Sequence, residues 1–244
     1  MIVKNLFTYL EEEGCGKPLL FIHGWGSSHL DFQGTAKLAS ANYRIINVDL
    51  WGFGSSEAPI EVWGSEEYAD AVLEIVRKLE LEDICIVGHS FGGKIASILC
   101  SKYPGLFTSL ILVDSAGIVK KQSLFLKYRI KRYKKLKKLV ECGKRNEKVL
   151  DKFGSSDYKN TNIYMRQIMV KVVNENLESV FEKIKVPTLI FWGKKDKDTP
   201  LCMGKKINKL IKGSKLIILN GGHFSHIDCF QKFNKLCFDF WRNL

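Results

Sequence analysis

The chain has 244 residues, enough for one domain with a small insertion, because single hydrophobic cores stop growing near about 250–300 residues. Hydrophobic residues make up 45% of it and charged residues 26%, a composition that excludes a mainly disordered or fibrous protein. No stretch approaches the roughly 20 apolar residues of a membrane span, and the first residues lack the pattern of a signal peptide, so we expect a cytoplasmic protein.

Cysteine and charge are distributed differently along the chain. The seven cysteines are scattered and form no pair of Cys-x-x-Cys motifs, so we expect reduced thiols and no zinc site. The formal net charge of +12 is instead concentrated, because residues 119–148 hold 13 Lys and Arg against two acids, Glu141 and Glu147.

Short apolar runs recur along the chain and predict buried strands. After an expected hairpin that includes Leu6 to Tyr9 and turns near Gly14, such runs occupy 19–22, 45–48, 84–87, 110–113, 188–191 and 216–219. Runs of this kind are typical of strands buried on both faces, and the helical patterns between them indicate a largely parallel sheet. The clearest helix has Ser65 as its expected N-cap and apolar residues at amphipathic spacing up to Leu79. We therefore predict an α/β fold, a mostly parallel β-sheet flanked by helices.

One segment, residues 115–183, interrupts this alternation. It contains no buried strand run, and basic or polar residues dominate it. We predict that it forms a helical lid of two to four helices, inserted into a core made of residues 1–114 and 184–244.

The run 84–87 leads directly into the motif that carries the chemistry. Gly88-His89-Ser90-Phe91-Gly92 follows the strand and precedes a helical stretch, which is the strand, turn and helix of a G-x-S-x-G nucleophile elbow. Ser90 is therefore the candidate nucleophile, and the start of the helix behind it offers unpaired N–H groups to an oxyanion.

With this elbow the sequence resembles the α/β-hydrolase family, and further motifs extend the resemblance over most of the chain. His23-Gly24-Trp25-Gly26, after the first parallel strand, is similar to the family's oxyanion loop. The resemblance implies that the backbone N–H groups of Trp25 and Phe91 form the oxyanion hole. The loop that begins at Asp49 is also similar to a family motif, in which its role is to shape the site.

The remaining two triad members follow from the same resemblance. Gly193-Lys194-Lys195-Asp196, with Pro200 after it, resembles the family's acid motif, and Gly222-His223-Phe224 resembles its histidine motif. The chain order Ser, Asp, His is the one expected of this fold. His223 would act as general base and Asp196 would orient it.

Other acids and histidines compete for these roles. Asp114, at the end of a strand, occupies the position from which some family members supply the acid, whereas Asp198 is expected to be a solvated loop carboxylate. For the remaining histidines we expect structural roles at His23 and His89, surface exposure at His29, and capping or surface exposure at His226.

We predict hydrolysis of an ester or similar small-molecule acyl substrate through an acyl-enzyme, without metal or organic cofactor. One alternative is a carbon–carbon bond hydrolase of the same fold. Those relatives characteristically have Asn before the nucleophile and Trp after the histidine, where this chain has His89 and Phe224, although Arg166 would suit a substrate carboxylate. Another alternative is a slow-turnover ligand receptor, which the sequence does not distinguish from an enzyme.

The basic stretch Lys127–Val140 has one apolar face at helical spacing, flanked by lysines. Three interpretations stand: a lid helix with solvated lysines, which we favour, steering of an anionic substrate, and contact with a membrane surface. The pattern matches no nucleic-acid-binding module.

Overall fold

The computed structural model describes residues 1–119, 124–146, 149 and 163–244. Its centre is a seven-stranded sheet in the order β3-β5-β4-β6-β7-β8-β9, in which only β3 runs antiparallel to its neighbour. The strands are β3 (Leu10–Glu13), β4 (Pro18–Ile22), β5 (Arg44–Val48), β6 (Ile84–His89), β7 (Phe107–Val113), β8 (Thr188–Gly193) and β9 (Lys215–Leu219). Each of the six predicted runs lies within one of them, and the predicted α/β fold is confirmed.

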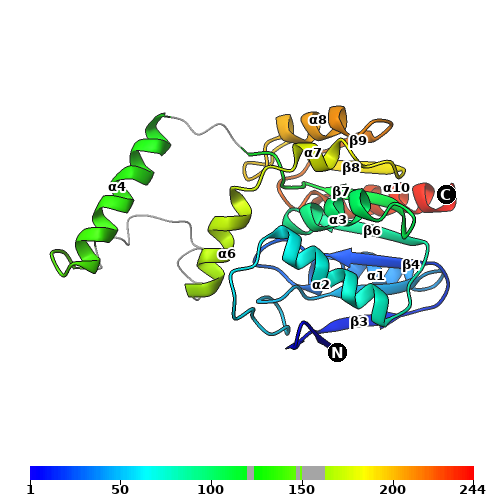
Figure 1. Ribbon diagram of the computed structural model, residues 1–244. Helices are drawn as coiled ribbons and strands as arrows, with labels where there is room; N and C mark the ends of the chain where they lie inside the picture. The colour runs from blue at the N-terminus through cyan, green and yellow to red at the C-terminus, as the bar shows by residue number, and fades with distance from the viewer. Residues whose placement is uncertain (120–123, 147–148, 150–162) are drawn as a thin grey trace.

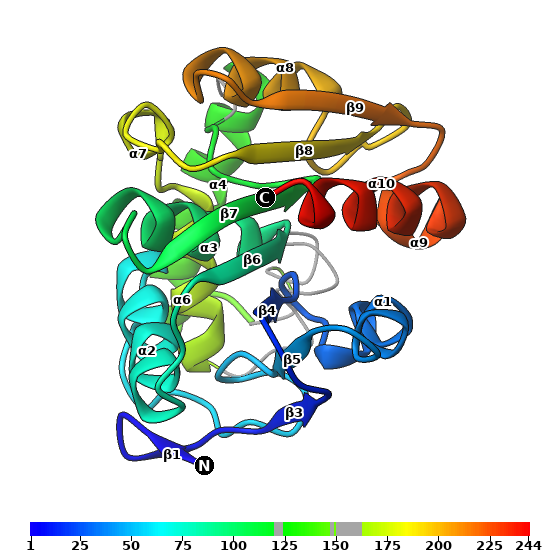
Figure 2. The ribbon, with the colours of Figure 1, turned by 90° about the vertical axis from the view of Figure 1, so that its right-hand side faces the viewer.

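Helices cover both faces of the sheet, as Figure 2 shows. One face carries α2 (Ser65–Lys78), α3 (Phe91–Lys102) and α8 (Leu201–Leu210), and the other carries α1 (Gln33–Ala39), α9 (Ser225–Asp228) and α10 (Phe230–Arg242). Alternate strand residues divide between the two cores: Ile86 packs with α2 and α3, whereas Val87 packs with α10. Burial on both faces is the reason that these strands are continuously apolar.

The amino terminus differs from the prediction. The hairpin is shorter and earlier, with β1 (Ile2–Val3) paired to β2 (Leu6–Phe7) around Lys4 and Asn5, whose φ angles are 49° and 61°. Two residues with positive φ make the tight turn that matches the twist of a hairpin. The strand β3 then pairs with β5 rather than with a hairpin partner.

The cap of α2 also differs, because Gly64 and not Ser65 is the N-cap residue. The side chain of Glu67 accepts a hydrogen bond from Gly64 N at 2.7 Å. Ser65 is instead the first helical residue, and its hydroxyl donates a hydrogen bond to the carboxylate of Glu175.

The segment after β7 contains α4 (Leu124–Glu141), α6 (Ile163–Val173) and α7 (Glu178–Phe181). Figure 1 shows α4 well away from the sheet and α6 beside the core. The division into a core and a lid of residues 115–183 stays a prediction, because 120–123, 147–148 and 150–162 lie outside the described residues.

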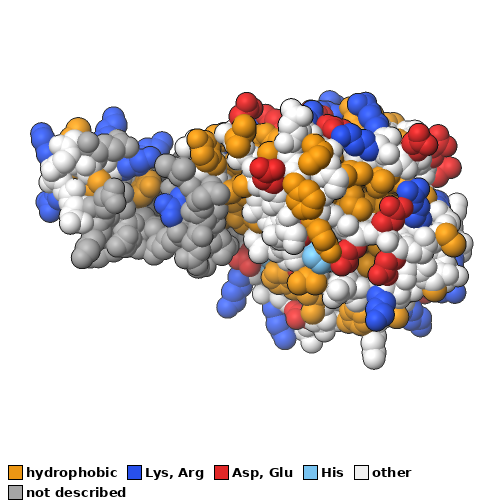
Figure 3. Space-filling view, turned by 90° about the horizontal axis from the view of Figure 1, so that it is seen from below, with side chains coloured by type: hydrophobic (Ala, Val, Ile, Leu, Met, Phe, Trp, Pro, Cys, Tyr) orange, Lys and Arg blue, Asp and Glu red, His pale blue; other side chains and the backbone are white. Residues whose placement is uncertain are grey.

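The side chains of α4 and α6 reflect this difference. On α4, Lys134 and Lys135 are exposed, and Figure 3 shows Lys and Arg at the far end of the protrusion. On α6, Met165, Ile168 and Val172 are buried in the same core as α2 and α3. No described helix is both long enough and apolar enough to span a membrane.

Candidate active site

Ser90 lies in the tight turn between β6 and α3. Its φ of 49° and ψ of −108° are strained for a residue with a side chain, as expected at a nucleophile elbow. A Cβ atom at Gly88 would approach the carbonyl oxygen of Gly92 to 2.5 Å, so the turn closes only with glycine there. Ser90 N donates to Val113 O at 3.0 Å, which ties the turn to the neighbouring strand β7.

The structure brings Ser90, His223 and Asp196 together at the carboxyl edge of the sheet. The Ser90 Oγ to His223 Nε2 distance is 2.9 Å, and the His223 Nδ1 to Asp196 Oδ2 distance is 2.8 Å. Asp196 follows β8 and His223 follows β9, and these are the last two strands in the order of the sheet. The chain of contacts has the geometry of a nucleophile, a base and an orienting acid.

Electrostatics favour a protonatable His223 beside an ionised Asp196. Burial lowers the pKa of His223, but the hydrogen bond and charge of Asp196 outweigh it and leave the pKa above its usual value. Burial raises the pKa of Asp196, but hydrogen bonds from His223 and Thr199 outweigh it and leave that pKa below its usual value. With Nδ1–H donated to the carboxylate, Nε2 is free to accept the Ser90 proton.

Thr199 was not singled out in the sequence, yet it supports Asp196 directly. Its hydroxyl donates to Asp196 Oδ2 at 2.7 Å, and its backbone N–H donates to Asp196 Oδ1 at 3.0 Å. The backbone N–H of Asp198 also donates to Oδ1, at 2.8 Å. The Asp-x-x-Thr spacing is the sequence signal for such a turn, because Asp side chains bind backbone N–H groups two and three residues later.

Asp114 is fully buried, and both oxygens of its carboxylate accept hydrogen bonds from backbone N–H groups. Oδ1 accepts from Gly193 N at 2.6 Å, and Oδ2 accepts from Ser225 N at 3.0 Å. Burial raises its pKa to about 6, although both hydrogen bonds favour the ionised form. Asp114 therefore holds together the loops that carry Asp196 and His223. Asp198 is exposed, as expected.

The loop after β4 lies directly beside the elbow. A Cβ atom at Gly24 would come within 3.2 Å of Ser90 Cβ and 2.8 Å of His89 Nδ1, so this glycine permits the close approach. The ring of Trp25 packs against Phe91 and Phe53, with centroid distances of 5.6 and 4.8 Å. Phe91 is the first residue of α3, so its N–H has no acceptor within the helix.

His23 and His89 have the structural contacts that were expected. His23 is buried, with Nδ1 donating to Gly24 O at 2.7 Å and Nε2 accepting from Leu50 N at 2.9 Å. His89 donates from Nε2 to His223 O at 2.8 Å, and so holds the backbone of the candidate base.

The expectation of surface exposure is wrong for His29 and His226. His29 is partly buried, and its Nδ1 lies 2.8 Å from Oδ1 of Asp49, which begins the loop after β5. His226, the second residue of α9, is buried, and its ring packs on Phe32 and His89 at centroid distances of 4.8 and 5.0 Å. Burial lowers the pKa of His226 to about 3, so the ring is neutral.

Two groups of described side chains have the spacing of metal ligands, with donor atoms within 4.8 Å of one another. In the first, Asp196 and His223 are already bonded to each other, with Asp198 beside them. In the second, with His89 and His226, both Asp114 carboxylate oxygens already accept backbone N–H groups. The carboxylates of both groups thus have partners within the protein, whereas neither ring nitrogen of His226 has a hydrogen-bond partner among the described residues.

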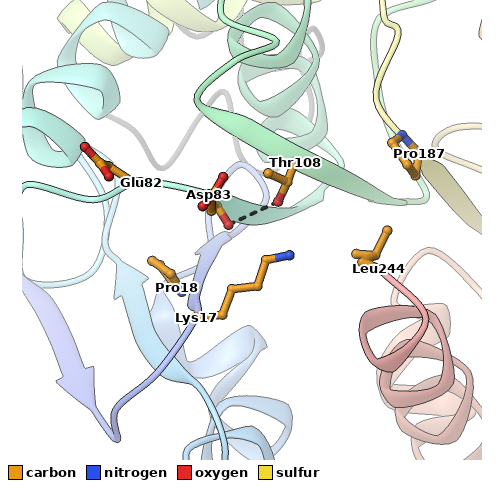
Figure 4. A pocket seen from close by; sticks show the side chains of 7 residues that line it. All are labelled: Lys17, Pro18, Glu82, Asp83, Thr108, Pro187 and Leu244. Carbon is orange, nitrogen blue, oxygen red and sulfur yellow. Dashed lines mark hydrogen bonds between the residues drawn. The ribbon is translucent and has the colours of Figure 1, made fainter.

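A pocket of 620 Å³ lies elsewhere on the molecule (Figure 4). Pro18, Asp83 and Pro187 line it, and they lie at or just before the starts of β4, β6 and β8. The pocket is therefore at the edge of the sheet opposite Ser90. Ligands of open α/β sheets bind beyond the carboxyl ends of the strands, so geometry favours the Ser90 edge as the candidate site.

Comparison with known proteins gives a family model, described as the alpha/beta hydrolase fold, that matches residues 17–139. The chain is 28% identical to the AB hydrolase superfamily protein YisY of Bacillus subtilis (strain 168), over 97% of this chain and 96% of that protein. It is 29% identical to Lipase 1 of Psychrobacter immobilis, over 89% of this chain and 74% of the lipase. The solved structure of an esterase (EaEST) from Exiguobacterium antarcticum has a TM-score of 0.78 and 26% identity, covering 98% of this chain and 97% of that one.

Proposed function

The chain belongs to the α/β-hydrolase fold family, and on that premise we propose that it is a serine hydrolase acting on an ester or related acyl compound. The observation that carries this proposal is the continuous contact from Ser90 Oγ through the His223 ring to Asp196, at 2.9 and 2.8 Å. Relatives named as a lipase and an esterase support the same reaction type.

In the proposed reaction, Ser90 Oγ attacks the carbonyl carbon while His223 Nε2 takes its proton. The tetrahedral intermediate then collapses, as His223 returns that proton to the leaving alkoxide and an acyl-enzyme remains. Water attacks the acyl group with His223 again as base, and Ser90 is released. Asp196 stabilises the imidazolium that forms in both halves of the reaction.

The negative charge on the carbonyl oxygen needs donors beside the elbow. We assign this role to the backbone N–H groups of Phe91, at the start of α3, and Trp25, in the loop that lies against Ser90. Each donor of this kind typically contributes about 3–4 kcal/mol of transition-state stabilisation. The rings of Trp25, Phe53 and Phe91 pack together next to this position, which favours an apolar acyl group.

Labelling with a fluorophosphonate probe, followed by steady-state rates on p-nitrophenyl esters, tests the proposal. We expect Ser90→Ala to abolish both labelling and turnover in a folded protein, and Ser101→Ala, on the same helix α3, to change neither. Labelling of folded Ser90→Ala at another serine would contradict the assignment.

The same measurements separate the alternatives. A single labelled turnover with no steady-state rate on any ester would favour a ligand receptor. Cleavage of a carbon–carbon bond in a dienoate substrate, faster than cleavage of any ester, would favour the carbon–carbon hydrolase.

A further inference from the structure

Lys94 is a buried lysine on α3, four residues after Ser90, and only 2% of it is exposed. A buried ammonium group is costly unless it is paired and hydrogen-bonded. Its Nζ donates to the backbone oxygen of Val172 and to Glu175 Oε2, the latter at 3.0 Å. Both partners belong to the end of α6 and the turn after it. The structure therefore joins the helix that follows the nucleophile to the segment that returns from the insertion.

The carboxylate of Glu175 connects a third element to this contact. It accepts the Ser65 N–H at 3.1 Å and also the Ser65 hydroxyl, at the first residue of α2. Burial lowers the pKa of Lys94, whereas the charge of Glu175 favours the ionised form. A single carboxylate thus satisfies both a helix N-terminus and a buried cation, so α2, α3 and the end of α6 depend on it together.

The other end of α6 reaches the edge of the sheet where Ser90 lies. Met165 is buried, and a Cβ atom at Gly52 would collide with its sulfur, so the side chain packs directly on the loop after β5. From Met165 to Val172 the helix is about 10 Å long, at roughly 1.5 Å per residue. Met165 and Val172 therefore lie on one helix, about two turns apart.

We propose that Lys94 and Glu175 form a positioning pair that fixes α6 against α2 and α3 and so determines acyl-chain preference. The pair would act through Met165, which packs on Gly52. The next residue, Phe53, belongs to the aromatic cluster with Trp25 beside Ser90. This inference rests on the proposed hydrolase function and adds to it a pair of residues that touch no reacting atom.

The variants Glu175→Gln and Lys94→Met each remove one charge of the pair. The double variant Lys94→Met/Glu175→Gln removes both charges, so that no unpaired buried charge is left to prevent folding. We expect amide hydrogen exchange across 163–173 to accelerate about tenfold, because opening of α6 becomes easier. We expect the kcat/KM ratio of p-nitrophenyl octanoate to p-nitrophenyl acetate to change about fivefold, with kcat on the acetate nearly unchanged. A purely structural role would lower both ester rates together.

The matched control is Lys171→Met, which breaks the 3.0 Å pair between Lys171 on α6 and Glu67 on α2. Those side chains are 40% and 47% exposed, so their pair is hydrated and contributes little. We expect this control to change neither exchange nor chain-length preference.

An unchanged chain-length ratio in the folded double variant overturns the proposal, and so does unchanged exchange in α6. If the wild-type protein hydrolyses no ester, the proposed function fails on its own. The exchange measurement then still decides whether the pair positions α6, because it needs no substrate.

Discussion

Asp114 and Asp196 follow neighbouring strands, β7 and β8, and both carboxylates are buried at the same edge of the sheet. They differ in what occupies their oxygens. Both oxygens of Asp114 accept backbone N–H groups, from Gly193 and Ser225. Asp196 has one oxygen for backbone N–H groups and presents the other to His223 and Thr199.

This difference shows that position at a strand end is not enough to supply an orienting acid. The carboxylate must also keep one oxygen available to the imidazole. The Asp114 oxygens accept N–H groups from two separate loops, so Asp114 serves as a clamp between them, while Asp196 faces the candidate base. Thr199 lies between the two residues: its hydroxyl donates to Asp196 Oδ2 at 2.7 Å and is 3.0 Å from the backbone oxygen of Asp114.

The largest expected effect is that of Asp196→Asn on kcat. Loss of the orienting carboxylate leaves the imidazole in the wrong tautomer, and in serine triads this lowers kcat by about 10⁴-fold. Steady-state rates on an ester that the wild type hydrolyses measure the loss. Asp198→Asn is the matched control at an exposed carboxylate two residues away, and its kcat should fall by less than about tenfold.

Thr199→Val should lower kcat by about tenfold, because hydrogen bonds to charged groups contribute about 1.5–3 kcal/mol and part of this stabilises Asp196 in its ionised form. The substitution keeps the shape of the side chain and removes only the hydroxyl. Rates should be compared with those of Asp196→Asn. A Thr199→Val enzyme as active as the wild type would mean that the backbone N–H groups alone hold the carboxylate.

Asp114→Asn should lower kcat by less than about tenfold when the protein is folded. Circular dichroism and an unfolding curve must accompany the rate, because a buried clamp acts on stability as well. If folded Asp114→Asn loses activity while Asp196→Asn keeps it, the orienting acid follows β7 and the comparison above is reversed.

The two carboxylates should also affect stability with opposite dependence on pH. The pKa of Asp114 is raised from 3.8 to about 6, so its contribution to stability is complete below pH 3.8 and is lost as pH rises through 6. The pKa of Asp196 is lowered, so its contribution is present above 3.8 and is lost as pH falls through its folded-state value.

Urea unfolding of the wild type and Asp114→Asn between pH 4 and pH 7 checks this sign. The free energy of unfolding of the variant minus that of the wild type should increase as pH rises, by at most about 1.4 kcal/mol per pH unit. A difference that is constant with pH would show that Asp114 ionises normally in the folded protein.

Much of this site could be predicted because its signals are local. The elbow around Ser90 is contiguous, and the glycines, the strand before it and the helix after it all lie within a few residues. The resemblance of their motifs to those of the family indicates Asp196 and His223. Because each follows a parallel strand, both are expected at the same edge of the sheet. The six apolar runs predicted the strands because burial on both faces requires a continuous apolar pattern.

Only the tertiary structure decided which polar groups meet across the chain. Lys94 and Glu175 are 81 residues apart, and nothing in the spacing of either residue indicates the other. The same holds for Asp114 and Ser225, 111 residues apart, whose hydrogen bond turns a candidate acid into a clamp. His226 was expected to cap a helix or lie at the surface because it stands near the start of the last helix, but the fold buries it. Periodicity records which face of an element is apolar, whereas a hydrogen bond between distant residues depends on how elements pack, and packing is set by the whole fold.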